Sequence, residues 1–304
     1  MKAAVLHETG QPLSVEDMPE PEAGEGQSVV DVQAAGINFA DVLIKNGMYP
    51  QPPELPTILG NEVAGEVDGR RVVAFARLAG GGYAERVAVE DDWIFDLPAG
   101  ASYAEGAAFL TTYLTAWIPM TRQAHIHPDS NVLVTAAAGG VGTAAIQVAG
   151  FCGANITAAA GSDEKRELAR KLGAQRTVTY EEIGELDDID VAFDPVGGPV
   201  FAACIKALRP LGVAIAIGFA GGTWEPVDPA RLVGRNVGVQ GFYLGRLMGL
   251  RPELVRFEVH ELLALWRRGA LHPVVGAEFP LEQANEALDL IGSRQSTGKV
   301  VLVP

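Results

Sequence analysis

The sequence predicts an α/β protein with two different parts, a doubly wound parallel sheet and an antiparallel β domain. Residues 132–149 read VLVTAAAGGVGTAAIQVA, a β-branched run followed by a glycine-bearing turn and an alanine-rich helix. From residue 131 onward strand-like and helix-like segments alternate, which is typical of a parallel sheet covered on both faces. The segment up to about residue 110 instead contains short strand-like segments separated by Gly and Pro.

The first part is expected to be a compact antiparallel β domain. Its strand-like segments are rich in strand-forming residues and are bounded by turn residues. These segments are residues 2–6, 28–34, 63–67, 71–76 and 84–89. Residues 103–124 predict a helical stretch that leads into the second part.

The second part has Val/Ile/Ala-rich strands that end in the loops AAAGG, AAGS, DPVGG and IGFAGG. Ligands of open α/β sheets bind at the carboxyl ends of the strands, so these loops are expected to form the binding edge. A last helix over residues 252–268 and the tail VVLVP are expected to return to the first part. The expected strands are 132–136, 155–160, 177–180, 190–194, 212–217 and 237–242, and the expected helices are 140–151, 163–172 and 198–208.

The turn at residues 137–142 matches the dinucleotide fingerprint G-x-G-x-x-G, with alanine at the first position. Gly139 lets the backbone approach a pyrophosphate, and Gly142 lets the helix pack closely on the strand. The start of the helix then offers unpaired N–H groups and a partial positive charge to the phosphates. The alternative is a tight strand-to-helix turn without a ligand. The neighbouring strands and helices favour dinucleotide binding.

The tip of the second strand indicates which dinucleotide is bound. An NAD site usually has an acidic residue there, about 20 residues past the fingerprint. This chain has Ala, Gly and Ser at residues 160–162, and Lys165 follows one turn into the next helix. Small groups and a cation suit the 2′-phosphate of NADPH. The alternative is that Ser162 only caps its helix and Lys165 is solvated, and Asp163 lies beside them.

Composition excludes several other functions. The net charge is −15, from 23 basic and 38 acidic residues, which argues against nucleic acid or an anionic membrane as a partner. No apolar run is long enough to span a membrane, and the first ten residues do not resemble a signal peptide. The cysteines, Cys152 and Cys204, are expected to be buried thiols of a cytoplasmic protein.

Several motifs together resemble the medium-chain dehydrogenase/reductase superfamily. They are AAAGGVG at 136–142, DPVGG at 194–198, STGKVVLVP at 296–304 and the long run INFADVLIKNGMYPQPPELPTILGNEVAGEV at 37–67. The resemblance is strongest to the zinc-free quinone oxidoreductases, the zeta-crystallin-like branch. It implies a GroES-like catalytic domain at 1–118 and 246–304, a Rossmann domain at 119–245 that binds NADPH, and a homodimer.

The resemblance also implies roles for individual residues. Asn38 would face the nicotinamide and polarise the substrate carbonyl, and Tyr49 would line the pocket. The alternatives are that Asn38 satisfies local backbone groups and that Tyr49 is only a loop aromatic. Lys299 matches some members only and is not included. The cofactor-binding residues are expected to be Asn38, Thr115, Gly139, Gly140, Val141, Gly142, Ser162, Lys165, Tyr180, Gly218, Phe242 and Arg294.

Zinc is not expected. The zinc-dependent relatives carry a cysteine where residues 36–41 read GINFAD, and a Gly-His-Glu motif where this chain has Asn61 in place of histidine. A catalytic zinc site needs three protein ligands of the Cys, His or carboxylate type. His125 and His127 are closer to a solvated turn than to a ligand pair.

The expected function is the NADPH-dependent, metal-independent reduction of quinones or similar activated carbonyls and enones. Without a metal, hydride transfer must depend on positioning and on a few hydrogen-bond donors. One alternative is an enoyl-thioester reductase, in which Tyr49 could donate a proton to the α-carbon. Another is a non-catalytic NADPH-binding protein.

Overall fold

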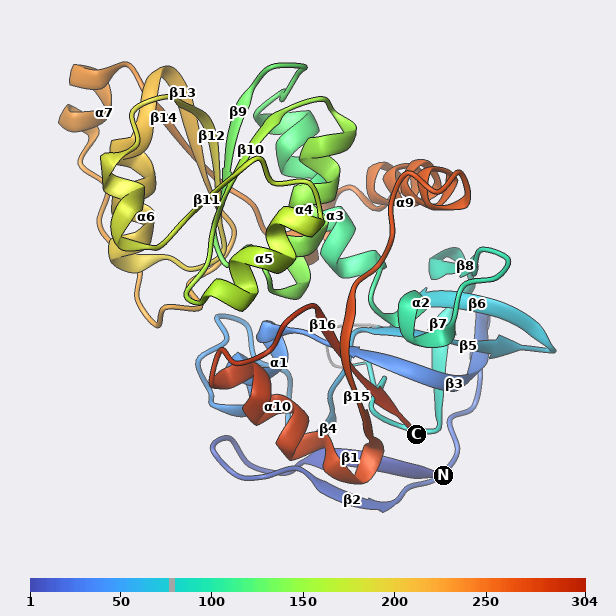
Figure 1. Ribbon diagram of the computed structural model, residues 1–304. Helices are drawn as coiled ribbons and strands as arrows, with labels where there is room; N and C mark the ends of the chain where they lie inside the picture. The colour runs from blue at the N-terminus through green and yellow to red at the C-terminus, as the bar shows by residue number, and fades with distance from the viewer. Residues whose placement is uncertain (77–79) are drawn as a thin grey trace. The chain divides into compact units, whose positions relative to one another are not determined.

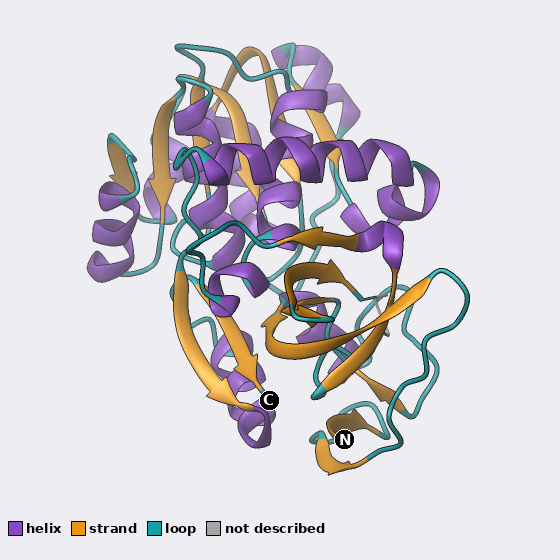
Figure 2. Cartoon of the chain, turned by 90° about the vertical axis from the view of Figure 1, so that its right-hand side faces the viewer, coloured by secondary structure: helices purple, strands orange, loops and turns teal. Residues whose placement is uncertain are grey.

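The chain divides by its contacts into two units, unit 1 with residues Met1–Thr111 and Pro273–Pro304 and unit 2 with residues Thr112–His272. The computed structural model describes residues 1–76 and 80–304. In unit 2 strands and helices alternate along the chain, whereas unit 1 is built mainly of strands (Figures 1 and 2).

In the described part of the chain, unit 2 holds a sheet of six strands in the order β11-β10-β9-β12-β13-β14. Every neighbouring pair is parallel. The chain starts at the centre of the sheet, moves outward to one edge and then returns to build the other half, so the switch point lies between β9 and β12. The strands are β9 (Asn131–Val134), β10 (Asn155–Ala159), β11 (Arg176–Val178), β12 (Ile189–Asp194), β13 (Leu208–Ala216) and β14 (Gly238–Gly241).

Helices cover both faces of this sheet. Helix α4 packs against β9 and β10, α5 against β10 and β11, and α6 against β12 and β13. Helices α4 and α5 lie on one side and α6 on the other (Figure 1). The helices of this unit include α3 (Leu110–Ile118), which begins at the boundary, α4 (Gly140–Phe151), α5 (Asp163–Lys171), α6 (Gly198–Ala207), α7 (Pro229–Arg235), α8 (Leu244–Leu250) and α9 (Pro252–Arg267), with shorter helical turns at η2 (Pro119–Gln123) and η3 (Glu181–Glu185).

The central strands are buried on both faces, which explains their nearly continuous apolar sequences. In β9 the residues after Asn131 are all buried, and in β10 all residues after Asn155 are buried. Helix α6 contributes Phe201 and Cys204 to the core between itself and the sheet. Burial of this apolar surface is the main contribution to the stability of the unit.

Among its described residues, unit 1 has one larger and one smaller sheet. The larger sheet has the strand order β15-β16-β3-β5-β6-β8 with β7 paired to β3, and the smaller has the order β2-β1-β4. All pairs are antiparallel except β15 with β16, which are parallel. The elements are β1 (Lys2–Leu6), β2 (Ser14–Asp17), β3 (Gln27–Ile37), α1 (Phe39–Lys45), β4 (Thr57–Ile58), β5 (Glu62–Val67), β6 (Arg70–Phe75), β7 (Arg86–Glu90), η1 (Asp91–Trp93), β8 (Ile94–Asp96), α2 (Tyr103–Ala107), β15 (Val275–Pro280), η4 (Leu281–Gln283), α10 (Ala284–Gly292) and β16 (Lys299–Val303).

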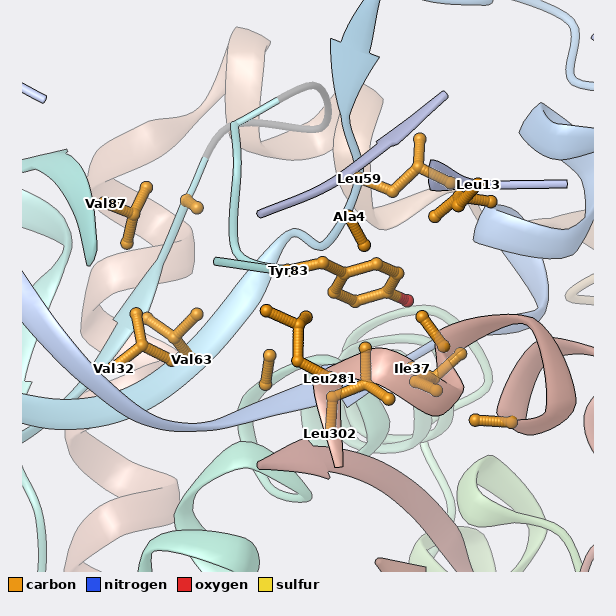
Figure 3. Close-up of a cluster of buried hydrophobic side chains, with 14 of the residues drawn as sticks. Ala4, Leu13, Val32, Ile37, Leu59, Val63, Tyr83, Val87, Leu281 and Leu302 are labelled. Atoms are coloured by element: carbon orange, nitrogen blue, oxygen red, sulfur yellow. The ribbon is translucent and has the colours of Figure 1, made fainter. Parts of the chain in front are cut away.

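The core of unit 1 surrounds the ring of Tyr83. Leu59, Ile37, Leu281 and Leu302 lie around it, from segments far apart in the sequence (Figure 3). Tyr83 is fully buried, and its neighbourhood includes strands from both ends of the chain. The C-terminal strand is therefore part of the same core as the N-terminal residues.

The expected fold class is confirmed, and the expected strands and helices of unit 2 lie close to the observed ones. The sequence analysis assigned no element to α1, β2, β15 or α10. Strands β2 and β15 have no fully buried residue, but in β15 the half-buried Val275, Ala277 and Phe279 alternate with exposed positions, a pattern that the sequence analysis did not use. The first part is also not purely antiparallel, because β15 pairs with β16 in parallel.

The helix expected at 252–268 is present as α9, but its contacts place it in unit 2 rather than with the first part. One of its contacts in that unit is made by the buried Glu258, which accepts hydrogen bonds from Trp117 Nε1 at 2.7 Å and Arg122 Nε at 2.8 Å. The contact-based division thus differs from 1–118, 119–245 and 246–304. As a division into functional domains, those bounds stay a prediction.

Two further observations concern the cysteines and the membrane. Cys204 is buried as expected, and burial raises its pKa, but Cys152 at the end of α4 is only half-buried. Among the residues that the structure describes, no helix is both long and apolar enough for a membrane span.

Helix α1 begins with a buried carboxyl group that joins it to the core. Asp41 Oδ2 accepts the backbone N–H of Asn38 and the hydroxyl of Tyr83, both at 2.7 Å. Burial raises the pKa of Asp41 from 3.8 to about 6, although both hydrogen bonds act in the opposite direction. Deprotonation of Asp41 in the folded protein is therefore costly.

The stability of unit 1 should depend on this proton. Because the pKa of Asp41 is higher in the folded than in the unfolded chain, its contribution to the free energy of unfolding falls as the pH rises from about 4 to about 6. A shift from 3.8 to about 6 corresponds to a loss of about 3 kcal/mol above this range. Asp41→Asn keeps an oxygen acceptor for both donors and carries no charge. We expect the free energy of unfolding of Asp41→Asn, relative to that of the wild type, to be higher at pH 7 than at about pH 4.5.

Urea unfolding of both proteins at the two pH values measures this difference, since the other titrating groups are shared. The same pH dependence in both proteins would contradict the assignment.

Candidate active site and dinucleotide site

The expected strand–turn–helix is present between β9 and α4. Gly139 precedes the helix, and a Cβ atom on Gly142 would lie 2.2 Å from the carbonyl oxygen of Ala136. Only glycine allows this close approach of helix and turn. The left-handed backbone conformation of the turn falls on Ala136, with φ 46°, and not on Ala137, the first position of the fingerprint. Ala137 is buried and donates its N–H to Ala159 O at 3.2 Å.

The first turn of α4 has the features of an anion site. Its N–H groups, on Gly140, Val141 and Gly142, have no acceptor four residues earlier in a helix. Gly139, Gly140 and Val141 are half-buried, so their backbone borders the surface of unit 2. The helix dipole adds partial positive charge at this end. The turn can therefore hold a phosphate group.

The tip of β10 is small and uncharged, as expected. Ser162 caps α5, its Oγ accepting the N–H of Lys165 at 3.3 Å. Ser162 therefore caps this helix, and its contact with a phosphate stays a prediction. Arg166 donates to Ala160 O at 2.8 Å and to Asp163 Oδ1 at 2.6 Å. Burial lowers the pKa of Lys165. Two cations therefore lie beside the strand tip, and Asp163 offsets one of them.

Tyr180 lies next to the same tip. A Cβ atom on Gly161 would be 3.7 Å from Cε2 of the Tyr180 ring. Tyr180 follows β11, and β10 and β11 are neighbours in the sheet, so their carboxyl ends meet at one edge. The structure therefore brings Ser162 and Tyr180 to the same edge, where the sequence analysis expects the 2′-phosphate of NADPH.

A buried carboxylate holds the loop after β12. Asp194 accepts hydrogen bonds from the hydroxyl of Thr135 and from the N–H groups of Val196 at 3.2 Å and Gly197 at 2.8 Å. Burial raises the pKa of Asp194. Because Thr135 opens the fingerprint turn, Asp194 fixes that turn against the DPVGG loop. The sequence analysis found the loop but not this role.

The next two loops complete the edge. A Cβ atom on Gly218 would lie 3.2 Å from Pro195 O, and the N–H of Phe242 donates to Ala216 O at 3.0 Å. Gly218 and Phe242 follow β13 and β14, so both lie at the carboxyl ends of the strands. Thr115 is buried within α3 of the same unit. Arg294 belongs to unit 1, where it has φ 60° after α10, so its role in cofactor binding stays a prediction.

Unit 1 contains a buried polar cluster that joins three segments. Lys299 Nζ donates to Glu62 Oε1 at 2.5 Å and to Asn38 Oδ1 at 2.6 Å. The side chains of Lys299 and Glu62 are 4% and 1% exposed, so this is an ion pair shielded from water. Glu62 Oε2 also accepts the N–H of Thr111 at 2.9 Å. We call Asn38, Asn61, Glu62 and Lys299 the Lys299 cluster.

The amide of Asn38 is fully engaged in the Lys299 cluster. Its Nδ2 donates to Asn61 Oδ1 at 2.8 Å and to Glu62 Oε1 at 3.0 Å, while its Oδ1 accepts from Lys299. An amide nitrogen has two hydrogens, so both are used. The expected interaction of Asn38 with a substrate carbonyl would have to replace one of these bonds.

Tyr49 is half-buried and packs against the core of unit 1. It lies after α1 and before β4. Neither a role in lining a substrate pocket nor proton donation follows from this placement, so both stay predictions.

Lys299 is a buried residue of the candidate site that the sequence analysis left out. Two signals were available, since Lys299 opens the apolar strand KVVLV and Glu62 opens the apolar strand EVAGEV. A charged residue buried in such a strand needs a partner. The sequence does not say which partner, because the two residues are 237 positions apart.

The donor set is a poor one for zinc. Over residues 1–76 and 80–304, no group of three or more His, Cys, Asp or Glu side chains is placed to hold a metal ion. In the Lys299 cluster Asn61 offers an amide, and the oxygens of Glu62 and Asn38 already accept from an ammonium group. Structural and catalytic zinc sites use thiolate, imidazole and carboxylate ligands.

Comparisons with known proteins match both parts of the chain. Residues 24–99 match the family model of the alcohol dehydrogenase GroES-like domain, and residues 140–261 match that of the zinc-binding dehydrogenases. Quinone oxidoreductase-like protein 2 of Rattus norvegicus is 36% identical over 99% of this chain and 91% of its own length. A homologue of that protein from Nematostella vectensis is 35% identical over 99% of this chain and 88% of its own length.

Solved structures agree with these relatives. The quinone oxidoreductase of Thermus thermophilus, also determined in complex with NADPH, has 40% sequence identity and a TM-score of 0.89 over the full length of both chains. Quinone oxidoreductase of Escherichia coli in complex with NADPH has 28% identity and a TM-score of 0.91, again over both full lengths. Since whole-length relatives share more than 30% of their residues with it, this chain belongs to the medium-chain dehydrogenase/reductase superfamily of oxidoreductases, among the quinone oxidoreductase-like proteins.

Proposed function

We propose that this protein uses NADPH to reduce quinones or related activated carbonyls and enones, and that it does so without zinc. The observation that carries the proposal is the Lys299 cluster, which fills the place of a metal ligand set with a buried ammonium group and two amides. The quinone oxidoreductases whose structures it resembles were determined with NADPH.

The carboxyl edge of unit 2 fits a dinucleotide phosphate. Gly142 leaves no side chain between the fingerprint turn and α4, and the first-turn N–H groups and the helix dipole favour an anion. The strand tip has no acidic residue to select a free ribose 2′-hydroxyl, and Lys165 lies beside it. When bound, NADPH supplies the hydride that reduces the substrate.

The Lys299 cluster suits polarisation by hydrogen bonds instead of by a metal. A cation placed among Asn38 Oδ1 and Glu62 Oε1 would meet the ammonium of Lys299, which is within 2.6 Å of both oxygens. Amide N–H groups can stabilise the negative charge that develops on a carbonyl oxygen. A quinone needs little such help, because its carbonyl carbons are already electrophilic and solvent can supply protons.

A cytoplasmic homodimer is the expected form of the enzyme.

The first test concerns the nucleotide. NADPH should bind about tenfold or more tightly than NADH, since a hydrogen bond between a phosphate and a cation is worth about 1.5–3 kcal/mol. Lys165→Ala should weaken NADPH binding and leave NADH binding nearly unchanged, as measured by nucleotide fluorescence titration. Lys171→Ala, at the far end of the same helix, is the matched control. Equal affinity of the wild-type protein for the two nucleotides would refute the assignment.

The second test concerns the metal. The purified protein should contain far less than one zinc per chain by elemental analysis, and a chelator should leave the reduction rate unchanged. The physical reason is that Asn38 Oδ1 and Glu62 Oε1, which could bind a metal ion, already accept hydrogen bonds from the ammonium group of Lys299. Loss of activity on chelation that zinc restores would show that the proposal is wrong on this point.

The third test separates quinone reduction from enoyl-thioester reduction. With NADPH, an ortho-quinone such as 9,10-phenanthrenequinone should be reduced faster than crotonyl-CoA, both measured by the loss of absorbance at 340 nm. Tyr49→Phe should change the quinone rate by less than about threefold, because no protein acid is needed there. If crotonyl-CoA is the better substrate and Tyr49→Phe is crippled, the enoyl-thioester alternative replaces the proposal.

A further inference from the structure

The Lys299 cluster fixes the orientation of two amides in series. Lys299 Nζ and the carboxylate of Glu62 lie on opposite atoms of the Asn38 amide. Turning that amide over would place its NH₂ group against an ammonium and its oxygen against a carboxylate. Asn38 therefore has one allowed orientation, and its second N–H must point to Asn61 Oδ1.

Asn61 is fixed in turn, and it has donors left. Its Oδ1 accepts from Asn38 at 2.8 Å, so its Nδ2 carries two N–H groups away from Asn38. Within residues 1–76 and 80–304, no protein acceptor lies within hydrogen-bond distance of this Nδ2. Asn61 is half-buried, whereas Asn38 is only 8% exposed. Lys299 has a third N–H, but its side chain is only 4% exposed, so the accessible free donors of the cluster belong to Asn61.

The backbone beside Asn61 is also held in place. Gly60 has φ 94°, and a Cβ atom there would lie 2.5 Å from the ring of Tyr83. Tyr83 is anchored by its hydrogen bond to Asp41. A donor fixed by its neighbours before the substrate arrives is what electrostatic stabilisation of a carbonyl requires, because little reorganisation remains to be done.

We infer that Asn61, and not Asn38, donates the hydrogen bond that polarises the substrate carbonyl, and that Asn38 and Lys299 are positioning residues that aim it. This rests on the proposed reduction of activated carbonyls. It changes the role expected for Asn38 from direct contact to orientation.

Kinetics of Asn61 variants test the donor. Asn61→Ala removes both donors, and Asn61→Asp keeps an acceptor for Asn38 without them. Both should lower kcat for 9,10-phenanthrenequinone by about 10- to 100-fold, less than the loss of a donor in more demanding reactions. The Kd of NADPH should stay within about twofold, because the donor contacts substrate only. Asn155→Ala, an exposed amide at the start of β10, is the control and should behave as wild type.

A double-mutant cycle tests the positioning residues. If Asn38 acts through Asn61, Asn38→Ala combined with Asn61→Ala should be no slower than Asn61→Ala alone. Losses that multiply would show that Asn38 contacts the substrate itself. Lys299→Arg, which keeps a charged donor, should retain more kcat than Lys299→Met at equal KM.

A measurement without turnover keeps the inference separate from the proposed function. With NADP⁺ bound, 2-cyclohexen-1-one cannot be reduced, and its carbonyl should shift the side-chain amide signals of Asn61 in ¹H–¹⁵N spectra. Signals are assigned by their loss in Asn61→Ala and Asn38→Ala. The Asn38 signals should stay unchanged. A shift of Asn38 alone, or of neither, overturns the inference. Failure of the wild type to reduce quinones or enones overturns only the proposed function.

Discussion

The buried ion pair between Lys299 and Glu62 is the interaction on which the candidate site depends. Each charge would be costly to bury alone, and removing one partner of such a pair typically costs about 3–5 kcal/mol. The pair joins β16, at the end of the chain, to β5, near its start. It also fixes Asn38, which accepts from Lys299 and donates toward Glu62. The closure of the fold and the orientation of the site amides therefore have the same physical cause.

Four buried carboxyl groups in this protein are satisfied in four different ways. Glu62 has an ammonium partner, and Asp41 keeps its proton up to about pH 6. Asp194 accepts three hydrogen bonds from a hydroxyl and two backbone N–H groups. Glu258 combines an indole N–H with the guanidinium of Arg122. The kind of partner differs with the role of the group. Backbone N–H groups bonded to Asp194 hold a loop, whereas Lys299 beside Glu62 orients the side chain of Asn38.

Much of unit 2 could be predicted from the sequence because its signals are local. The alternation of apolar strands and helices, and the glycines of the fingerprint turn, lie within short stretches of chain, and the observed α4 has the bounds expected for it. Unit 1 was harder. Strand β15 alternates half-buried and exposed residues, and in α10 the buried Ala284, Ala287 and Leu288 lie at helical spacing, but the sequence analysis used neither pattern. The place of β15 in the sheet also depends on its pairing with β16. The Lys299 cluster could not be assembled, since Lys299 lies 237 positions from Glu62 and 261 from Asn38, and periodicity carries no information on such pairs.

The Lys299 cluster disfavours a metal ion because of the charge of Lys299, and not only because histidine is absent at position 61. Replacing Asn61 by histidine would add an imidazole, but the ammonium of Lys299 would still lie 2.5 Å from Glu62 Oε1 and 2.6 Å from Asn38 Oδ1. A divalent cation there would meet a fixed positive charge at short range, in surroundings that screen it weakly. A histidine at position 61 alone would therefore leave the same fixed positive charge beside the oxygens of Glu62 and Asn38.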